Sequence, residues 1–210
     1  MWEQRAPEAI EEQSMEIIRR ELKGIACPPE CSPVVQRVIH TTADFTYAHT
    51  LYFSANALRA GREAIVRGTN IIADTNMVAA GINKGHLFRH GGRVVCHMAE
   101  KGVAIEAKNR GITRAAVAME KAVGEDPKGI YAIGNAPTAL LRLCELIAQG
   151  VARPALVVAV PVGFVNVVEA KERIMGLAVP QIVARGRKGG SPVAAAIINA
   201  LLYSINSGHD

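Results

Sequence analysis

His40 is the residue in this sequence whose position best suits acid–base chemistry. It follows an apolar helical pattern that ends at Ile39, so we expect it at the C-terminus of a helix. The helix dipole favours the charged imidazolium there, and the carboxylate of Asp44, four residues on, would favour it further. A histidine held in this way can donate a proton near neutral pH. A buried structural histidine is an equally good interpretation of the pattern.

Four polar segments, most of them rich in glycine, each follow an apolar run that is typical of a buried strand. They are residues 74–76, 134–138, 161–166 and 185–191. Ligands of open parallel sheets bind beyond the carboxyl ends of the strands. Three of these segments run into a predicted helix N-terminus, whose free N–H groups bind anions, and glycine lets a ligand approach closely. One such loop is an ordinary turn, but four at one edge predict a binding site.

The sequence contains no complete cofactor or metal motif. Residues 186–191 lack the spacing of a P-loop, and no Gly-x-Gly-x-x-Gly follows the first strand. Cys27 and Cys31 could begin a metal site, but no second cysteine pair completes it. The three histidines in residues 86–97 are spaced too loosely for a helical zinc motif. We therefore expect neither a cofactor nor a metal.

Ser14 lies on the apolar stripe of the first predicted helix. It stands four residues after Ile10 and three before Ile17. A hydroxyl on a buried face needs a hydrogen-bond partner. The pattern favours a bond from Ser14 to the backbone of its own helix, and the alternative is a contact with a ligand.

An alternation of strands and helices must position these segments. Helices are predicted over residues 7–22, 32–40, 54–67, 113–123, 137–149, 166–175 and 191–204, with a short one after residue 76. Strands are predicted at 71–73, 94–96, 129–133, 156–160 and 181–184, with a further short one at 51–53. Such apolar strands separated by helices indicate an α/β fold, with a parallel sheet covered on both faces.

The net charge of +5 favours an anionic partner. Nucleic acid is disfavoured because the basic residues are spread along the chain and only 4% of the residues are aromatic, which leaves few bases to stack on. A small polycarboxylate or a phosphate fits the charge equally well.

The composition is that of a folded protein, with half of its residues hydrophobic and 20% charged. The longest apolar stretch, residues 154–168, is broken by Pro161 and Gly163 and is too short to span a bilayer. The charged first 25 residues do not fit a signal peptide. We expect a cytoplasmic protein with reduced thiols and no membrane partner, in a single domain over residues 1–210.

Five segments together resemble the precorrin-8X methylmutase family, which includes the cobalt-precorrin-8 enzymes. They are R-V-I-H-T-T-A-D-F (37–45), A-D-T-N-M-V-A-A-G-I (73–82), A-I-G-N-A-P-T-A-L (132–140), P-V-G-F-V-N-V-V-E-A-K-E (161–172) and R-G-R-K-G-G-S (185–191). They occur in the family's order and spacing and span nearly the whole chain. This set is far more specific than any single motif, although C-P-P-E-C is not part of the pattern.

The resemblance implies a three-layer α/β/α fold with a mainly parallel, roughly five-stranded sheet. It implies a homodimer with a corrinoid pocket near the subunit interface, and no cofactor. The reaction would move a methyl group from C-11 to C-12 of precorrin-8X or cobalt-precorrin-8, giving hydrogenobyrinic or cobyrinic acid. His40 matches the family's proposed general acid.

The same resemblance points to residues that would contact the substrate. Ser14 would contact the ring or a carboxylate, and Lys84 and Arg114 would pair with carboxylates, unless both are solvated surface charges. The expected contacts from the loops and motifs above are Thr41, Asn76, Asn135 and Asn166.

Two other functions remain open from the sequence. A corrinoid-binding carrier would use the same fold and pocket, but it would not need an acid at the position of His40. A nucleotide-dependent oxidoreductase would also fit a doubly wound sheet, but the missing fingerprint argues against it.

Overall fold

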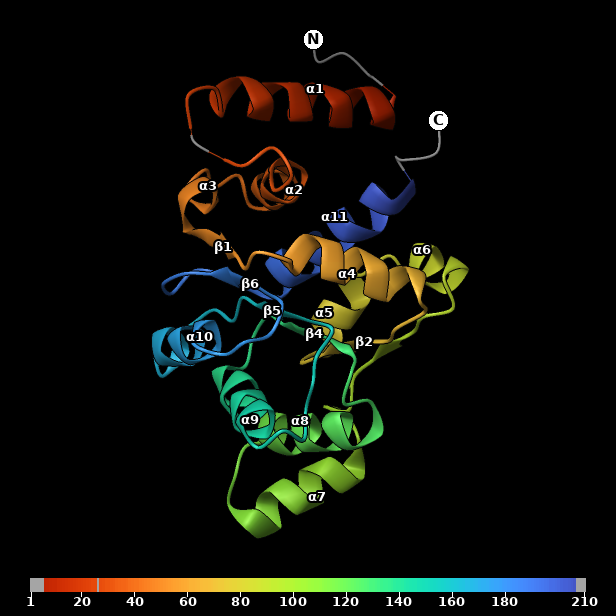
Figure 1. Ribbon diagram of the computed structural model, residues 1–210, viewed down its shortest axis with the longest axis vertical. Coiled ribbons are helices and arrows are strands. Elements are labelled where there is room, and N and C mark those ends of the chain that lie inside the picture. Colours follow the sequence, from red (N-terminus) through yellow and green to blue (C-terminus); the bar gives the residue numbers. More distant parts are fainter. Residues whose placement is uncertain (1–5, 26, 207–210) are drawn as a thin grey trace.

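A six-stranded sheet with helices on both faces forms the centre of the protein (Figure 1). The computed structural model describes residues 6–25 and 27–206. The strands are β1 Leu51–Phe53, β2 Ile71–Ala73, β3 Val94–Val95, β4 Ile130–Ile133, β5 Leu156–Ala159 and β6 Gln181–Ala184. Their order is β1-β6-β5-β4-β2-β3, and every pair except β1–β6 is parallel. The predicted α/β fold with a mainly parallel sheet is confirmed.

The sixth strand is the short segment at residues 51–53. It pairs antiparallel with β6, with Leu51 opposite Ala184, and so forms one edge of the sheet. A three-residue strand carries too little pattern to show its partner or its direction. The prediction of about five strands was therefore one short.

Alternate residues of each central strand enter separate hydrophobic clusters on the two faces. In β4, Ile130 and Ala132 pack on one side, and Tyr131 and Ile133 pack on the other. All four are buried. Burial on both faces explains why these strands are apolar throughout and show no polar alternation.

The helices divide between the two faces. On one side lie α1 Pro7–Glu21, α2 Ser32–Thr42, α4 Ala57–Val66, α5 Asn76–Gly81, α6 Lys84–Arg89 and α11 Ser191–Asn206. On the other lie α8 Arg114–Glu125, α9 Pro137–Ala148 and α10 Val167–Met175, with α7 Lys101–Arg110 packed outside α8. Figure 1 shows α1, α2, α4 and α11 on one side of the sheet and α7 to α10 on the other.

Three helices were missed from the sequence: α3 Tyr47–Thr50, α6 and α7. Both α3 and α6 are short. Helix α7 buries Val103 and Ala107 but leaves Ile105 exposed, so it lacks a clear apolar stripe. Helix α4 begins later than predicted because Ser54 extends the β1–β6 pair, where its N–H donates to Gln181 O at 3.0 Å.

The strand order reverses at β2. From β2 the chain passes to β3 on one side, and it then returns to place β4 on the other side. Such a reversal leaves a crevice at the carboxyl ends of the two strands that flank it, here β2 and β4. The segments at residues 74–76 and 134–138, which directly follow these strands, border this position.

The part of the chain that the structure describes contains no helix that is long and apolar enough to cross a membrane.

Replacing Gly134 by alanine tests the close packing at the end of β4. A Cβ at this position would lie 2.8 Å from Ser191 Cα and 2.9 Å from Val78 Cγ2. Gly134→Ala should therefore lower the free energy of unfolding by about 1–3 kcal/mol, as measured by urea denaturation. Gly124→Ala is the matched control, because a Cβ there meets no described atom within 4 Å and should stabilise helix α8 by up to about 1 kcal/mol. Equal effects of the two substitutions would contradict this packing.

Candidate functional site

Asp74 joins the loops that follow β2 and β4. Its carboxylate is buried, and Oδ1 accepts the N–H of Gly134 at 3.0 Å. Its Oδ2 accepts the N–H groups of Asn135 and Ala136, both at 2.8 Å. Burial raises the pKa of Asp74, and the backbone N–H donors oppose that rise. This carboxylate fixes the 134–136 turn beside α5, where the side chains of Asn135 and Asn76 are exposed.

The start of α11 lies beside the same loops. Thr75 caps α5, because its Oγ1 accepts the N–H of Val78 at 3.2 Å. The same oxygen lies 3.2 Å from Oγ of Ser191, the first residue of α11. The N-terminus of this long helix therefore meets the crevice between β2 and β4.

The loops after β5 and β6 are bound to each other. Gly190 N–H donates to Val160 O at 2.9 Å, and Gly163 N–H donates to Arg187 O at 3.2 Å. A Cβ at Gly189 would lie only 2.1 Å from Val160 O, so no other residue fits there without moving the backbone. The 161–166 and 185–191 segments therefore form one continuous surface.

A buried lysine of α10, Lys171, contacts the 185–191 loop from the core side. Lys171 is 1% exposed, and its Nζ donates to the carbonyl oxygens of Gly186 and Lys188, both at 2.8 Å. Burial lowers the pKa of Lys171 to about 8. The path of the 185–191 loop is thus tied to a charged group in the core.

The loop is also tied to the segment that follows His40. Lys188 Nζ lies 2.6 Å from Asp44 Oδ2 and 3.1 Å from Thr46 Oγ1, and Arg185 N–H donates to Thr50 O at 2.9 Å. The C-terminal end of α2 is therefore joined to the carboxyl edge of β6.

His40 lies in the last turn of α2, as predicted, and its side chain is exposed. The alternative of a buried structural histidine is wrong. Asp44 has different partners from those expected, because its carboxylate bonds to Lys188 and Thr46. The hydrogen bond from Lys188 lowers the pKa of Asp44 to about 2. The Asp44 carboxylate therefore ties the segment after α2 to the 185–191 loop.

Apolar and cationic side chains are exposed together around these loops. The exposed apolar residues are Met77, Val162, Phe164 and Val165. Two guanidinium groups lie over aromatic rings: Arg185 is 5.0 Å from the ring centre of Tyr52, and Arg187 is 5.6 Å from that of Phe164. Such a surface suits a large apolar ligand that carries several anionic groups.

The comparisons with known proteins agree on one family. Residues 9–204 match the family model of precorrin-8X methylmutase. A cobalt-precorrin-8 methylmutase from Priestia megaterium is 45% identical over 202 residues, which are 96% of this chain and 90% of that protein. A precorrin-8X methylmutase from Pseudomonas aeruginosa is 39% identical over 196 residues, which are 92% and 94% of the two chains. The crystal structure of a precorrin-8X methylmutase from Thermus thermophilus has a TM-score of 0.87 at 43% identity, and the match covers 96% of this chain and 100% of that one.

This chain belongs to the precorrin-8X methylmutase family. It is a methylmutase, an enzyme of the isomerase class in cobalamin biosynthesis. The five motifs that carried the resemblance in the sequence all fall within the matched residues.

The structure brings most of the expected contact residues of the methylmutase to one edge of the sheet. Asn135 and Asn166 are exposed on the loops after β4 and β5, and Asn76 is exposed at the start of α5, just after β2. Asn166 has a positive φ of 58° where it precedes α10. Thr41 follows His40 and donates its hydroxyl to Arg37 O at 2.9 Å.

Of the remaining three expected contacts, only Arg114 lies near this edge. Ser14 donates to Ile10 O at 2.8 Å, which is the bond within its own helix that the pattern favoured. Arg114 begins α8 near the β4 loop, because the preceding Thr113 bonds to Thr138 at 3.0 Å. Lys84 begins α6 away from that edge.

A contact between Asn83 and α11 shows how far Lys84 lies from the loops after β2 and β4. The N–H of Asn83, which precedes α6, donates to Asn199 Oδ1 at 2.8 Å. Asn199 is about two helical turns from Ser191, or about 12 Å along α11. Lys84 can therefore contact substrate only if the ligand extends this far along α11, or if it binds a ligand held by a second subunit.

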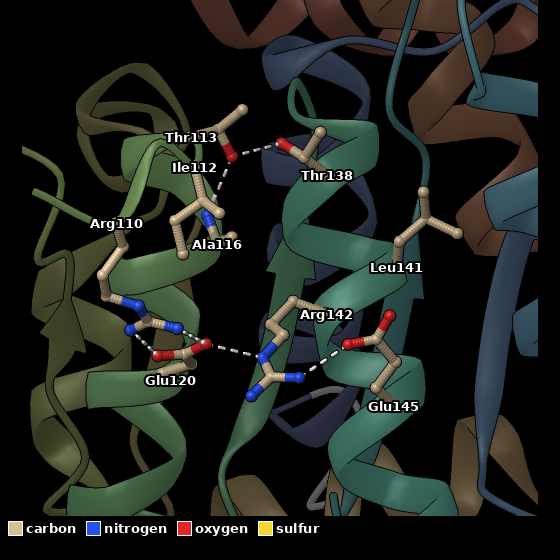
Figure 2. Close-up of a pocket in the computed structure, with 9 residues that line it drawn as sticks. All are labelled: Arg110, Ile112, Thr113, Ala116, Glu120, Thr138, Leu141, Arg142 and Glu145. Carbon is tan, nitrogen blue, oxygen red and sulfur yellow. Dashed lines mark hydrogen bonds and ion pairs between the residues drawn. The ribbon is translucent and has the colours of Figure 1, made fainter. Parts of the chain in front are cut away.

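A separate hollow of about 410 Å³ lies between α8 and α9 (Figure 2). Glu120 lies 2.5 Å from Arg110 Nη1 and 2.7 Å from Arg142 Nε, and Arg142 Nη1 lies 2.6 Å from Glu145. Because these charges already pair with one another, we interpret them as structural ion pairs that join α7, α8 and α9. Thr113 and Thr138 close the end nearest the β4 loop (Figure 2).

Sequence reasoning missed the two buried charges that hold the loops. Lys171 lies between Ala170 and Ile174 on the buried face of α10, and a lysine on an apolar stripe is the signal that could have found it. Asp74 directly follows three buried residues of β2, and it was interpreted only as part of a polar loop.

Lys188→Met tests the link between the β6 loop and Asp44. A carboxyl group whose pKa is lowered on folding adds stability above its ordinary pKa, here 3.8, and loses it as the pH falls towards 2. The substitution should cost at most about 1 kcal/mol at neutral pH, because the pair is exposed to solvent. The difference from wild type in urea unfolding should disappear near pH 2. Lys108→Met, on the exposed surface of α7, is the control, and a deficit of Lys188→Met that persists unchanged at low pH would contradict the assignment.

Proposed function

We propose that His40 is the general acid that moves a methyl group from C-11 to C-12 of precorrin-8X or cobalt-precorrin-8. The observation that carries this proposal is the exposed position of His40 in the last turn of α2, whose following segment is joined to the 185–191 loop through Asp44 and Lys188. The helix C-terminus favours the protonated ring that a general acid requires.

The chemistry needs only an acid and a shaped surface. Protonation of the conjugated ring makes it electron-poor, so the carbon at C-12 becomes a better acceptor for the methyl group. The bond from the methyl group to C-11 breaks as the bond to C-12 forms, and the rearranged ring then loses a proton that restores His40 to its acid form, so nothing is oxidised or reduced. Holding the ring in one geometry then supplies much of the remaining acceleration.

The surface around His40 supports a corrinoid as the ligand. A corrinoid is a flat apolar ring that carries several acetate and propionate groups. The exposed Phe164 and Val165 offer apolar contact to such a ring, and Arg185 and Arg187 offer charge to its carboxylates. Helix α11 begins at Ser191 beside Thr75, where the positive end of its dipole favours an anionic group.

His40→Ala tests the acid. We expect conversion of precorrin-8X to slow by about 10²–10⁴-fold, because a positioned acid contributes that much, while binding of the corrinoid product changes little. Single-turnover absorbance and product titration measure the two effects. His90→Ala, which alters a histidine just after α6, should leave both unchanged.

Near-wild-type turnover in His40→Ala would reject the acid assignment. If the unmodified protein bound product tightly but converted no substrate, a carrier function would replace the proposed one.

Assembly is the second part of the proposal. We infer a homodimer in the cytoplasm whose two pockets lie near the subunit contact. The family resemblance implies a dimer, a macrocycle with many carboxylates needs more cations than one sheet edge supplies easily, and Lys84 lies away from that edge. Each charged hydrogen bond is worth roughly 1.5–3 kcal/mol.

Lys84→Ala and Arg114→Ala should each weaken product binding by about tenfold to a hundredfold and slow the methyl shift less. The reason is that these residues would hold the periphery of the ring and not its reacting carbons. Titration of each variant with product measures the loss, and sedimentation should give twice the mass of the chain. Unchanged affinity in both variants would show solvated surface cations, and a monomer would reject a pocket near a subunit contact.

A further inference from the structure

Lys171 is a buried cation whose ammonium group bonds only to backbone in the structure described. Its side chain is 1% exposed, and the two contacts of Nζ are carbonyl oxygens of the 185–191 loop. Neighbours on the same face of α10, such as Ala170 and Ile174, are apolar. Burial of an ammonium group costs free energy, and the lowered pKa of Lys171 reflects that cost.

A lysine is not needed at this position for packing alone. Methionine has a similar volume and carries no charge, so it fills the same space without the cost of burying an ammonium group. What methionine cannot do is donate to Gly186 O and Lys188 O, which face Nζ at 2.8 Å. The specific contribution of Lys171 is therefore the position of the loop.

The 185–191 loop in turn contacts the segment that follows the helix of His40, the proposed acid. Lys171 holds the backbone of Lys188, and the side chain of Lys188 binds Asp44 at 2.6 Å. Asp44 follows the last turn of α2 by two residues, and that turn contains His40. Two charged hydrogen bonds, joined through Lys188, thus connect α10 to the segment that directly follows α2.

The same loop carries the cations of the site. Arg185 and Arg187 flank Gly186, whose carbonyl accepts one of the two Lys171 bonds. A shift of this backbone would therefore move both guanidinium groups and the Lys188 contact together.

We propose that Lys171 is a positioning residue of the methylmutase, which fixes the 185–191 loop and, through Lys188 and Asp44, the end of α2 that bears His40. This inference rests on the proposed function of His40. It makes Lys171 a determinant of turnover without any contact to the substrate.

Lys171→Met is the test, with Lys108→Met as a charge-matched control on the surface of α7. We expect kcat to fall by about 10²-fold, since a displacement of about 1 Å can cost that much, and KM to rise as the arginines move. The melting temperature should change by only a few degrees, because relief from burying the ammonium group offsets the loss of its two bonds to Gly186 O and Lys188 O. A purely structural lysine would give the opposite result, with a lowered melting temperature and unchanged kcat and KM in the folded enzyme.

A double-mutant cycle with Lys188→Met tests whether Lys171 affects activity through Lys188 or independently of it. Lys188→Met leaves its own carbonyl for Lys171 and removes the side-chain bonds to Asp44 and Thr46. If Lys171 acts through Lys188, the double variant loses no more activity than Lys171→Met alone. Losses that multiply would overturn the proposed path.

Lys171→Arg keeps the test decisive if the methionine variant does not fold. A guanidinium group can donate to both carbonyls, so kcat should return to within about tenfold of wild type. A folded Lys171→Arg enzyme with as little activity as His40→Ala would overturn the proposal. An active wild type with an unaffected Lys171→Met would reject this inference alone, whereas full turnover in His40→Ala would reject the proposed acid.

Discussion

The carboxylate of Asp74 is the interaction on which the shape of the site depends. It lies where the strand order reverses, and it accepts three backbone N–H groups from the loop after β4. Those groups would otherwise be buried without partners, which costs more than a surface hydrogen bond returns. Because the bonds go to backbone, the side chain of Asn135 is left free to face outward.

Lys171 solves the same problem at the other end of the edge with the opposite charge. Asp74 accepts from N–H groups, and Lys171 donates to carbonyl groups, so each buried charge matches the backbone atoms that its loop presents. Both loops are then rigid at their bases, while Phe164 and Arg187 are exposed at the surface. Such support from rigid elements is what a large ligand with many contact points requires.

Close packing of helices brings the remaining parts to this edge. Helix α11 contains three successive alanines at residues 194–196, and a Cβ at Gly81 would lie 2.7 Å from the Cβ of Ala195. Small residues on both helices let α5 lie directly against α11, which places Thr75 beside Ser191. Helix α11 also contacts α2, so the helix that bears His40 packs against the helix whose N-terminus lies beside the β2–β4 crevice.

The sequence by itself determined the α/β class, the central strands and the family, because periodicity and ordered motifs are local properties that burial imposes on the chain. It also placed His40 in the last turn of its helix. Only the tertiary structure decided that Asp44 binds Lys188, which is 144 residues away, and that the short strand at residues 51–53 pairs antiparallel with β6. It also revealed Lys171 beneath the 185–191 loop. Such partners depend on which distant segments the fold brings within about 3 Å, and no local pattern records that distance.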